Sequence, residues 1–117
     1  MTQRGDVVIV DFPFTARRTS KVRPALVVQN DQDNQRLRKT IIVMISGNLR
    51  RAGEPTHLLI DPGVPEGASS GLHGPSVVTC VNLYTIEQAS IIATIGRLSV
   101  ATMVHVDGCL KAALELS

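Results

Sequence analysis

Short apolar runs rich in valine and isoleucine, each ended by a polar or glycine-rich stretch, constrain the fold of this chain more than any other feature. Branched aliphatic residues in short runs, bounded by turn-forming residues, are typical of β-strands. The predicted strands cover residues 7–12, 25–30, 40–46, 56–61, 76–83 and 90–98, the last ending near Gly96. The chain is therefore expected to be mainly β.

Only the C-terminal segment has a convincing helical pattern. From Val100 onward apolar residues recur every three or four positions, and Ser99 precedes them as a candidate N-cap. Gly108 interrupts this segment. An interior glycine costs about 1 kcal/mol relative to alanine, so we expect a packing reason for it.

The connections between strands are expected to be mostly irregular. Residues 31–39 can hold a helical turn capped by Asp31 or Asp33, and residues 85–88 can open another. Residues 62–75 contain four glycines and three prolines and predict a long irregular connection. Together these elements predict a small antiparallel β-barrel, or a strongly bent sheet, with one packed helix.

Length and hydropathy favour one domain, residues 1–117. With 44% hydrophobic residues the chain can bury a core. No apolar run approaches the roughly 18 residues that cross a membrane, and the N-terminal MTQRGD lacks the apolar region of a secretory signal. We therefore expect a cytoplasmic protein without membrane contact. Cys80 and Cys109 lie in apolar surroundings and are expected to be buried free thiols.

The three histidines give no sign of a metal site. His57, His73 and His105 each lack a second histidine or cysteine at metal-ligand spacing, so we expect neither metal nor cofactor. His57 and His73 could form an acid–base pair for RNA cleavage. Nothing in the sequence brings them together, and the favoured interpretation leaves one half-buried and the other solvated.

Positive charge is concentrated in one part of the chain. Residues 17–51 hold nine of the twelve lysines and arginines and two acids, a balance of 9 − 2 = +7, whereas the remainder carries 3 − 8 = −5. Such asymmetry indicates a face that binds a polyanion. Solvated loop charges are the alternative interpretation.

Within this basic part, Arg23 directly precedes Pro24 at the start of a predicted strand. Residues 46–48 (Ser-Gly-Asn) end the next strand and are followed by Arg50 and Arg51. Strand ends on one rim of a small barrel converge, and a guanidinium there can grip a phosphate and stabilise its transition-state charge. From the residues alone, Arg23 is equally well a salt-bridge partner.

Five segments, in order, resemble those of one family: RGDVVIVDF, VRPALVVQND, VMISGNLRRAGEPTHLLI, SVVTCVNLYTI and IGRLSVATMVHVDGCLKAAL. The chain resembles the MazF/PemK (Kid) toxins of type II toxin–antitoxin systems over nearly its whole length. The most specific parts are Gly5-Asp6, Arg23-Pro24, the PTH of 55–57 and the IGRLS of 95–99.

This resemblance implies an SH3-like barrel of the CcdB/PemK type that forms a homodimer. It implies a metal-independent, sequence-selective endoribonuclease that cuts single-stranded RNA by attack of the 2′-hydroxyl, leaving a 2′,3′-cyclic phosphate and a 5′-hydroxyl. It also implies a cognate antitoxin with a disordered acidic segment, and contact with operator DNA only indirectly, through that antitoxin.

The family's catalytic arginine falls on Arg23, and its threonine after the third strand falls on Ser46, which keeps the hydroxyl. Arg23 would stabilise the phosphorane and Ser46 would position the phosphate. Asn48 and Asn82 could read base edges. The basic residues expected to follow the RNA backbone are Arg18, Lys21, Arg50 and Arg51.

The chain also departs from the family pattern. Its first loop, TARRTSK, lacks the acid that many relatives carry, so the position of that general base is vacant. Thr79, Val81 and Asn82 stand where relatives often have Arg, an acid and Gln, and Tyr84 replaces a later Arg. These departures leave cleavage to Arg23 and Ser46, with a different base specificity.

Two other functions stay open. CcdB toxins share the fold and poison gyrase without being enzymes, but they use an aromatic-containing C-terminal tail, and this chain ends in ALELS without tryptophan. A catalytically silent relative that only binds antitoxin and helps repress the operon is the other alternative.

Overall fold

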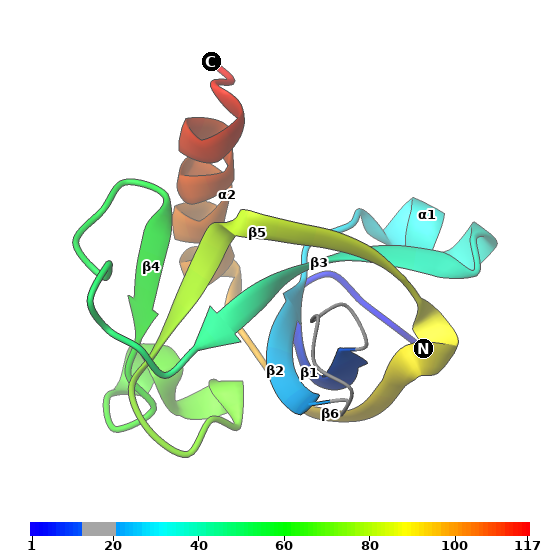
Figure 1. Cartoon of the computed structure of the whole chain (residues 1–117), viewed down its shortest axis with the longest axis horizontal. Helices are drawn as coiled ribbons and strands as arrows, with labels where there is room; N and C mark the ends of the chain where they lie inside the picture. The colour runs from blue at the N-terminus through cyan, green and yellow to red at the C-terminus, as the bar shows by residue number, and fades with distance from the viewer. Residues whose placement is uncertain (13–20) are drawn as a thin grey trace.

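The computed structural model describes residues 1–12 and 21–117, except for the side chains of residues 12 and 21. Its elements are β1 (Asp6–Phe12), β2 (Lys21–Val27), α1 (Asp31–Arg36), β3 (Lys39–Ser46), β4 (His57–Ile60), the 3-10 helix η1 (Pro65–Ser70), β5 (Ser76–Glu87), the 3-10 turn η2 (Gln88–Ser90), β6 (Ile91–Arg97) and α2 (Val100–Leu114). The strands form one antiparallel sheet in the order β4-β5-β3-β2-β1-β6. The predicted mainly β chain with a C-terminal helix is confirmed (Figure 1).

The sheet curls because β5 bends around the molecule (Figure 1). Along β5, Thr79 pairs with Met44 and Leu83 pairs with the preceding Val43. Residues 80–82 therefore form a bulge that no residue of β3 opposes, and a bulge bends a strand and strengthens its twist. Inside the curl lies one apolar cluster: Val8, Val10, Ala25, Val27, Ile42 and Ile86.

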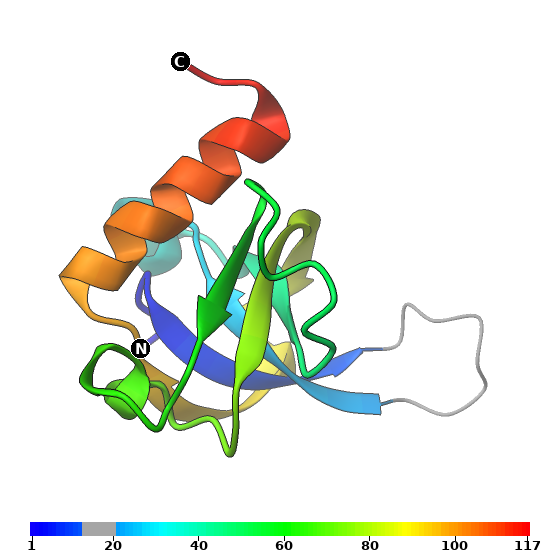
Figure 2. The same cartoon turned by 90° about the vertical axis from the view of Figure 1, so that its left-hand side faces the viewer.

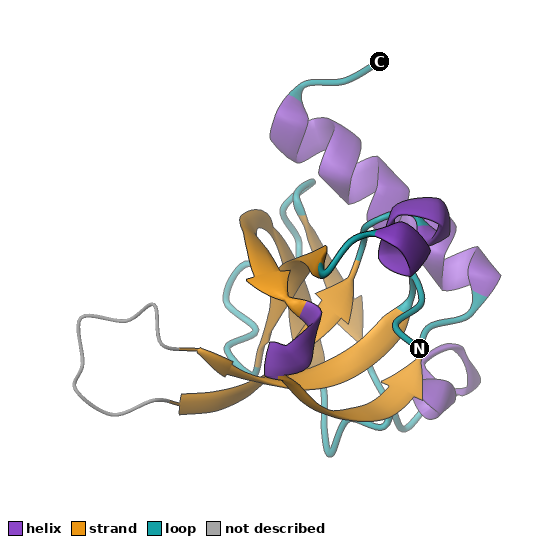
Figure 3. Ribbon diagram, turned by 90° about the vertical axis from the view of Figure 1, so that its right-hand side faces the viewer, coloured by secondary structure: helices purple, strands orange, loops and turns teal. Residues whose placement is uncertain are grey.

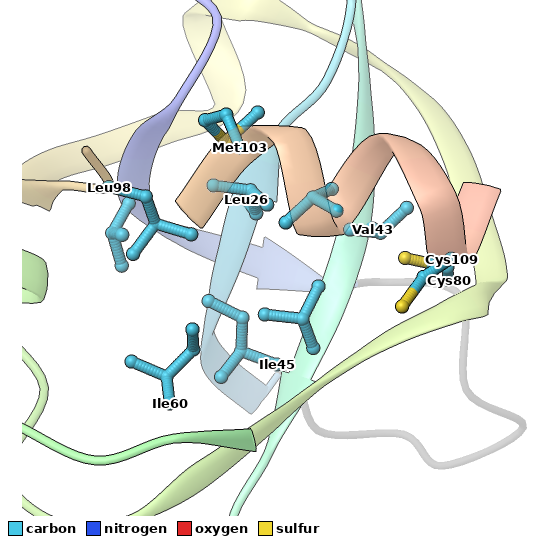
Figure 4. Packing of buried hydrophobic residues seen from close by; sticks show 11 residues of the cluster. Leu26, Val43, Ile45, Ile60, Cys80, Leu98, Met103 and Cys109 are labelled. Carbon is cyan, nitrogen blue, oxygen red and sulfur yellow. The ribbon is translucent and has the colours of Figure 1, made fainter. Parts of the chain in front are cut away.

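A second apolar cluster lies between the outer face of the sheet and α2 (Figure 2 and Figure 3). Leu26, Val43 and Ile45 reach it from the sheet, while Met103 and Cys109 reach it from the helix (Figure 4). Because both faces of the central strands are covered, the pattern of β3 is almost continuously apolar.

The two cysteines are buried free thiols, as predicted. Cys80 of β5 and Cys109 of α2 lie beside each other in the outer cluster (Figure 4). Burial, together with the neighbouring Cys109, raises the pKa of the Cys80 thiol to about 12. Burial also raises the pKa of Cys109.

Helix α2 begins as predicted, because the Ser99 Oγ accepts a hydrogen bond from the Thr102 N–H at 3.1 Å. The packing reason expected for Gly108 is wrong: apart from its chain neighbours and the nearby backbone of its own helix, no heavy atom of the described chain lies within 4 Å of where its Cβ would be. Both candidate caps for α1 are also wrong. The cap is Asn30, whose Oδ1 accepts the Asp33 N–H at 2.8 Å.

The largest differences from the predicted strands are in β2, which runs over Lys21–Val27 rather than residues 25–30, and at the end of β5. Residues 85–87 do not form a helical turn, because they continue β5 by pairing with residues 39–41 of β3. Pro24 is not the first residue of β2, since it pairs with Ile9 within the strand. The strand β3 pairs with β2 only from Ala25 onward. One side of β2 is therefore open at Pro24, where a missing N–H is tolerated.

The connection over residues 62–75 is more ordered than predicted, because it contains η1 packed directly on β6. A Cβ on Gly96 would lie 2.3 Å from the backbone of Ser70. Gly71 has a φ of +73°, and its Cβ would lie 1.9 Å from the Ile95 carbonyl oxygen. Only glycine fits this crossing, which explains the glycine of IGRLS.

Within the described residues, no helix combines the length and the apolar character that crossing a membrane would require.

Candidate nucleic-acid interface

Arg23 lies in β2 with a half-buried side chain, opposite the fully buried Val10 of β1. Alternation along the strand places it on the same face as Ala25, at the open end of the curl. Within the described residues it forms no ion pair, and residues 13–20 contain no Asp or Glu. The salt-bridge interpretation therefore has no support, and the charge is available to an external anion.

Ser46 is the last residue of β3 and lies two residues beyond the last β2–β3 pair, Ala25 with Met44; Arg23 lies two residues beyond the same pair on β2. Alternation along each strand places both residues on the face of Ala25 and Met44, at the end where β2 and β3 no longer pair. The Ser46 Oγ accepts the Asn48 N–H at 3.1 Å. Its own O–H proton can still be donated. A guanidinium and a hydroxyl thus lie on the same face of the sheet, at neighbouring strand ends.

A pocket of about 500 Å³ opens beside Ser46. It lies between the end of β3, the loop that leads to β4, and the bulge of β5, and we call it the bulge pocket. Its lining residues are Ser46, Asn48, Arg50, Arg51, Glu54, Thr56, His57, Thr79, Val81 and Asn82. Five residues predicted from the sequence to contact RNA or position the phosphate therefore meet in one place: Ser46, Asn48, Arg50, Arg51 and Asn82.

The loop after β3 holds its polar groups by local hydrogen bonds. The Asn48 Oδ1 accepts the Arg50 N–H at 3.0 Å, which leaves the Asn48 amide hydrogens for other partners. The Arg51 Nη1 lies 3.4 Å from both carboxylate oxygens of Glu54. Arg50 is exposed and has no carboxylate partner in the part of the chain that the structure describes. Positive charge at the pocket rim therefore comes mainly from Arg50.

The bulge in β5 turns Val81 and Asn82 toward the pocket, where both are exposed. The Thr79 hydroxyl donates to the Met44 carbonyl at 2.8 Å, and the Asn82 Nδ2 lies 3.5 Å from the Thr79 Oγ1. This chain of contacts ties the Asn82 amide to the sheet. One amide hydrogen and the Oδ1 of Asn82 remain for a ligand.

His57, the first residue of β4, forms part of the pocket wall. It pairs with Thr79 of β5 and is 7% exposed, so it is more buried than the half-buried state that the sequence suggested. One ring nitrogen, Nδ1, lies 2.8 Å from the Thr56 hydroxyl. His73 is exposed and lines a different pocket, so the structure does not bring the two histidines together.

Other predicted residues lie elsewhere. Arg18 falls within residues 13–20, outside the described residues, and Lys21 begins β2 with a side chain that is not described. Residues 36–39 supply three of the cations in the basic part of the chain, but they precede β3 or begin it, whereas Ser46 ends it (Figure 1). The basic segment is therefore split between two ends of the sheet rather than gathered on one face.

Two residues of the pocket wall, Glu54 and Thr56, were not among the predicted site residues. His57 was considered only as an acid–base partner of His73, and Thr79 and Val81 only as departures from the family pattern. The PTH motif of residues 55–57 could have indicated Thr56 and His57, because it is one of the most specific parts of the family resemblance. Strand patterns in the sequence do not show which strands pair with each other. They therefore could not show that β4 lies next to β5, or that a bulge in β5 brings Val81 into the pocket.

Together, the curled antiparallel sheet, the packed terminal helix and the basic pocket beside Ser46 define a small, mainly β protein with a polar pocket at one end of its sheet. The chain matches the description "PemK-like, MazF-like toxin of type II toxin-antitoxin system" over residues 3–114. It is 31% identical to "Endoribonuclease EndoA" of Bacillus subtilis over 99% of this chain and 97% of that protein. It is 29% identical to "Endoribonuclease MazF" of Staphylococcus epidermidis over 100% of this chain and 94% of that protein.

Solved structures agree on the fold. The chain superposes with a TM-score of 0.81 and 24% identity on "Endoribonuclease in complex with its cognate antitoxin from Mycobacterial species", covering 100% of this chain and 98% of that one. For "MazE-MazF (Form-III) from Deinococcus radiodurans" the TM-score is 0.76 at 19% identity, and the match covers 99% of this chain and 98% of that one.

The chain belongs to the PemK-like, MazF-like toxin family of type II toxin–antitoxin systems. Its class is that of the endoribonuclease toxins, and its fold is of the predicted CcdB/PemK type.

Proposed function

We propose that this toxin is a metal-independent, sequence-selective endoribonuclease that cuts single-stranded RNA. This proposal is supported by Arg23, a cation without a carboxylate partner in the described chain, which lies on the same sheet face as the Ser46 hydroxyl at the neighbouring strand end. Such a pair suits a phosphodiester, because the guanidinium grips two phosphate oxygens while the hydroxyl donates to one of them. The 2′-hydroxyl requirement makes RNA rather than DNA the substrate.

In the proposed reaction, the 2′-hydroxyl loses its proton to a base and attacks the adjacent phosphorus. The bond from phosphorus to the 5′-oxygen breaks, which leaves a 2′,3′-cyclic phosphate and a 5′-hydroxyl after protonation of the leaving oxygen. Arg23 stabilises the charge of the phosphorane and can supply that proton, and Ser46 holds the phosphate. Fixed donors aimed at developing charge are worth about 100- to 1,000-fold each in rate.

The substrate strand extends from this point along the basic rim. Arg50 and Arg51 neutralise the RNA backbone, together with Arg18 and Lys21 from the first loop and the start of β2. Asn48 and Asn82 offer amide groups to base edges. Local hydrogen bonds hold both amides in place, which supports a reading role.

A cognate antitoxin with a disordered acidic segment is the proposed partner. Two of the similar solved structures are described as toxins bound to an antitoxin. An acidic segment that orders on the basic rim would occlude the RNA site. Operator DNA would be contacted only through the antitoxin. The proposed location is the cytoplasm.

We further propose that the toxin is a homodimer that buries the outer face of α2 beside β4. Val100 and Val104 are 84% and 62% exposed, and Leu59 and Val64 are 47% and 41% exposed. Next to them is a mostly apolar pocket of about 420 Å³. Asp61 and Glu66 also line it, and they would repel RNA and an acidic antitoxin segment alike. A second copy of the chain is therefore the proposed occupant.

The test of this function is incubation of the full-length toxin with a long single-stranded RNA in EDTA. We expect cutting, with 5′ ends that polynucleotide kinase phosphorylates without prior phosphatase treatment, and no cutting of DNA of the same sequence. Cutting that needs a divalent cation, or ends that already carry a 5′-phosphate, would contradict the mechanism. RNA binding without cutting would identify a silent relative, and gyrase-dependent DNA breaks without RNA cutting would identify a gyrase poison.

A further inference from the structure

We infer that His57 is the general base of the proposed cleavage: its Nε2 takes the proton of the attacking 2′-hydroxyl, while Arg23 protonates the leaving 5′-oxygen. This inference rests on the proposed function and assigns the step that the proposed reaction leaves without a residue. The histidine acts together with Arg23, and not with His73, which the sequence offered as its partner.

Carboxylates on β1 and in the bulge pocket are poorly placed to take this proton. Asp11 follows Val10, the residue of β1 that pairs with Arg23, so alternation directs Asp11 to the other face of the sheet. Glu54 lines the bulge pocket, but both of its carboxylate oxygens lie 3.4 Å from the Arg51 Nη1. Residues 13–20 contain no Asp or Glu. A neutral imidazole is therefore the better-placed base at this end of the sheet.

His57 lies on the same face of the sheet as Ser46 and Arg23. It pairs with Thr79 of β5, which in turn pairs with Met44 of β3, and residues directly opposite each other point to one face. Ser46 lies two residues beyond Met44 and so points to that face as well. His57 and Ser46 also line the same pocket. A ribose next to a phosphate held at Ser46 can therefore meet the histidine.

The strand order places the base and the acid on opposite sides of the phosphate. In the order β4-β5-β3-β2, the strand of Ser46 lies between the strands of His57 and Arg23 (Figure 1). At about 4.8 Å per strand, His57 is roughly 10 Å from β3 on one side and Arg23 roughly 5 Å on the other. The attacking and leaving oxygens of a phosphoryl transfer lie roughly in line through phosphorus. A base and an acid on opposite sides of Ser46 fit that requirement.

The His57 ring is held in the orientation that a base needs. Its Nδ1 lies 2.8 Å from the Thr56 hydroxyl. When Nδ1 carries the ring hydrogen and donates it to the Thr56 Oγ1, Nε2 keeps a free electron pair. Nε2 has no hydrogen-bond partner in the described chain, and it is not among the fully buried unpaired atoms. It is therefore open to a hydroxyl in the pocket that His57 lines.

The charged groups that face His57 in the described chain come from the loop between β3 and β4: Arg50, Arg51 and Glu54. The pocket residues from β5 and from the end of β3 are uncharged. Among these residue types, histidine alone ordinarily titrates between pH 5 and pH 8. A pH dependence of cutting in that range therefore reports on the imidazole.

In the inferred step, the His57 Nε2 accepts the proton of the 2′-hydroxyl as the 2′-oxygen bonds to phosphorus. The bond from phosphorus to the 5′-oxygen breaks, and its electron pair leaves with that oxygen, which takes a proton from Arg23. The imidazolium then gives its proton to water and Arg23 regains one, so both side chains return to their starting state. A general base contributes about 100- to 10,000-fold to such a rate.

The experiment measures kcat and KM for one short single-stranded RNA, in EDTA, from pH 5 to pH 8. The kcat of the wild type should fall as the pH is lowered, because a protonated imidazole cannot accept a proton. His57→Gln should lower kcat at pH 8 about 100-fold or more, change KM by less than about threefold, and remove the fall at acid pH. His73→Gln is the matched control, since His73 is exposed and lines a different pocket, and it should behave as the wild type. Glu54→Gln should keep the fall at acid pH.

Two further measurements separate a base from a structural role. Imidazole added to His57→Ala should restore part of the lost rate. An RNA with sulfur in place of the 5′-oxygen at the mapped cut has a leaving group that needs no proton. On this substrate His57→Gln should stay about 100-fold slower than the wild type, whereas Arg23→Ala should recover part of its rate. Thr56→Val, which removes only the hydroxyl that orients the ring, should lower kcat about tenfold.

A fall at acid pH that persists in His57→Gln, or that Glu54→Gln removes instead, would overturn the inference while leaving the nuclease intact. Recovery of the wild-type rate by His57→Gln on the sulfur substrate would also overturn it, because the histidine would then be the acid. A wild-type kcat in Thr56→Val would contradict the orienting contact. If the wild type cuts no RNA, the proposed function fails, and the inference fails with it.

Discussion

At the scale of single residues, Arg23 shows what the fold adds to the sequence. An arginine before a proline is compatible with a structural ion pair or with anion binding. The structure does not support the first interpretation within the described chain, because none of the ion pairs formed there includes Arg23. The resulting unpaired cation lies on the same sheet face as Ser46, at the neighbouring strand end, so the two residues are suited to bind one phosphate.

Ser46 offers a test of that unit. Ser46→Ala removes the hydroxyl that holds the phosphate and should lower kcat/KM on a short fluorogenic RNA about 100-fold. Ser46→Thr keeps the hydroxyl and should stay within about threefold of the wild type. An alanine variant as active as the threonine variant would show that the hydroxyl takes no part.

The pKa of Cys80 gives a test of burial. Since burial raises it from 9.0 to about 12, the folded protein keeps the proton that the unfolded chain releases above pH 9. The contribution of the protonated Cys80 thiol to the free energy of unfolding is complete below pH 9. It is lost as the pH rises toward 12, at up to about 1.4 kcal/mol per pH unit. The free energy of unfolding, measured with urea at pH 8 and at pH 10, should fall less between these two pH values for Cys80→Ala than for the wild type. Equal losses in the two proteins would contradict this.

At the scale of elements, the crossing of η1 over β6 depends on glycine. Gly96→Ala would place a Cβ 2.3 Å from the backbone of Ser70, so one of the two elements must move. We expect a loss of unfolding free energy of about 3 kcal/mol or more, in the range of strongly disruptive substitutions. Chemical denaturation measures it.

Gly53→Ala is the matched control, because within the described residues no heavy atom beyond the chain neighbours of Gly53 lies within 4 Å of where its Cβ would be. Its unfolding free energy should change by less than about 0.5 kcal/mol. Equal losses at the two positions would show that the crossing is looser than described.

Elements with a strong local signal could be predicted from the sequence. The apolar pattern of β3 and the serine cap of α2 are local, and both were predicted correctly. The boundaries of β2 and β5 depend on which neighbour each strand pairs with, and local patterns do not show this. The same reason applies to the site: Ser46 and Asn48 are two residues apart in the sequence, whereas His57 joins them only through the pairing of β4 with β5.

At the scale of the whole molecule, charge and apolar surface occupy different places. The basic pocket lies at the end of β3, while the apolar surface follows the outer side of α2 and the adjacent β4. An RNA strand and a second copy of the chain can therefore bind without competing for one surface.

The dimer can be tested by a charge on that apolar surface. Val104→Glu should shift the wild-type dimer to a monomer in sedimentation equilibrium, because a carboxylate would be desolvated in the interface. Ile92→Glu is the control, since Ile92 on β6 is 59% exposed, close to the 62% of Val104, but lies elsewhere. A wild type that is monomeric at all concentrations, or dissociation caused by Ile92→Glu instead, would refute the interface.

The central claim is that Arg23 acts on the RNA phosphate. The direct measurement compares the rate of cutting of one single-stranded RNA in EDTA by the wild type, Arg23→Ala and Arg36→Ala. Arg36 is the matched control because it pairs with Asp33 on α1, which precedes β3 and therefore lies away from Ser46 at its end. The account predicts that Arg23→Ala cuts at least about 100-fold more slowly while Arg36→Ala cuts at the wild-type rate. A folded Arg23→Ala protein that cuts as fast as the wild type would contradict it.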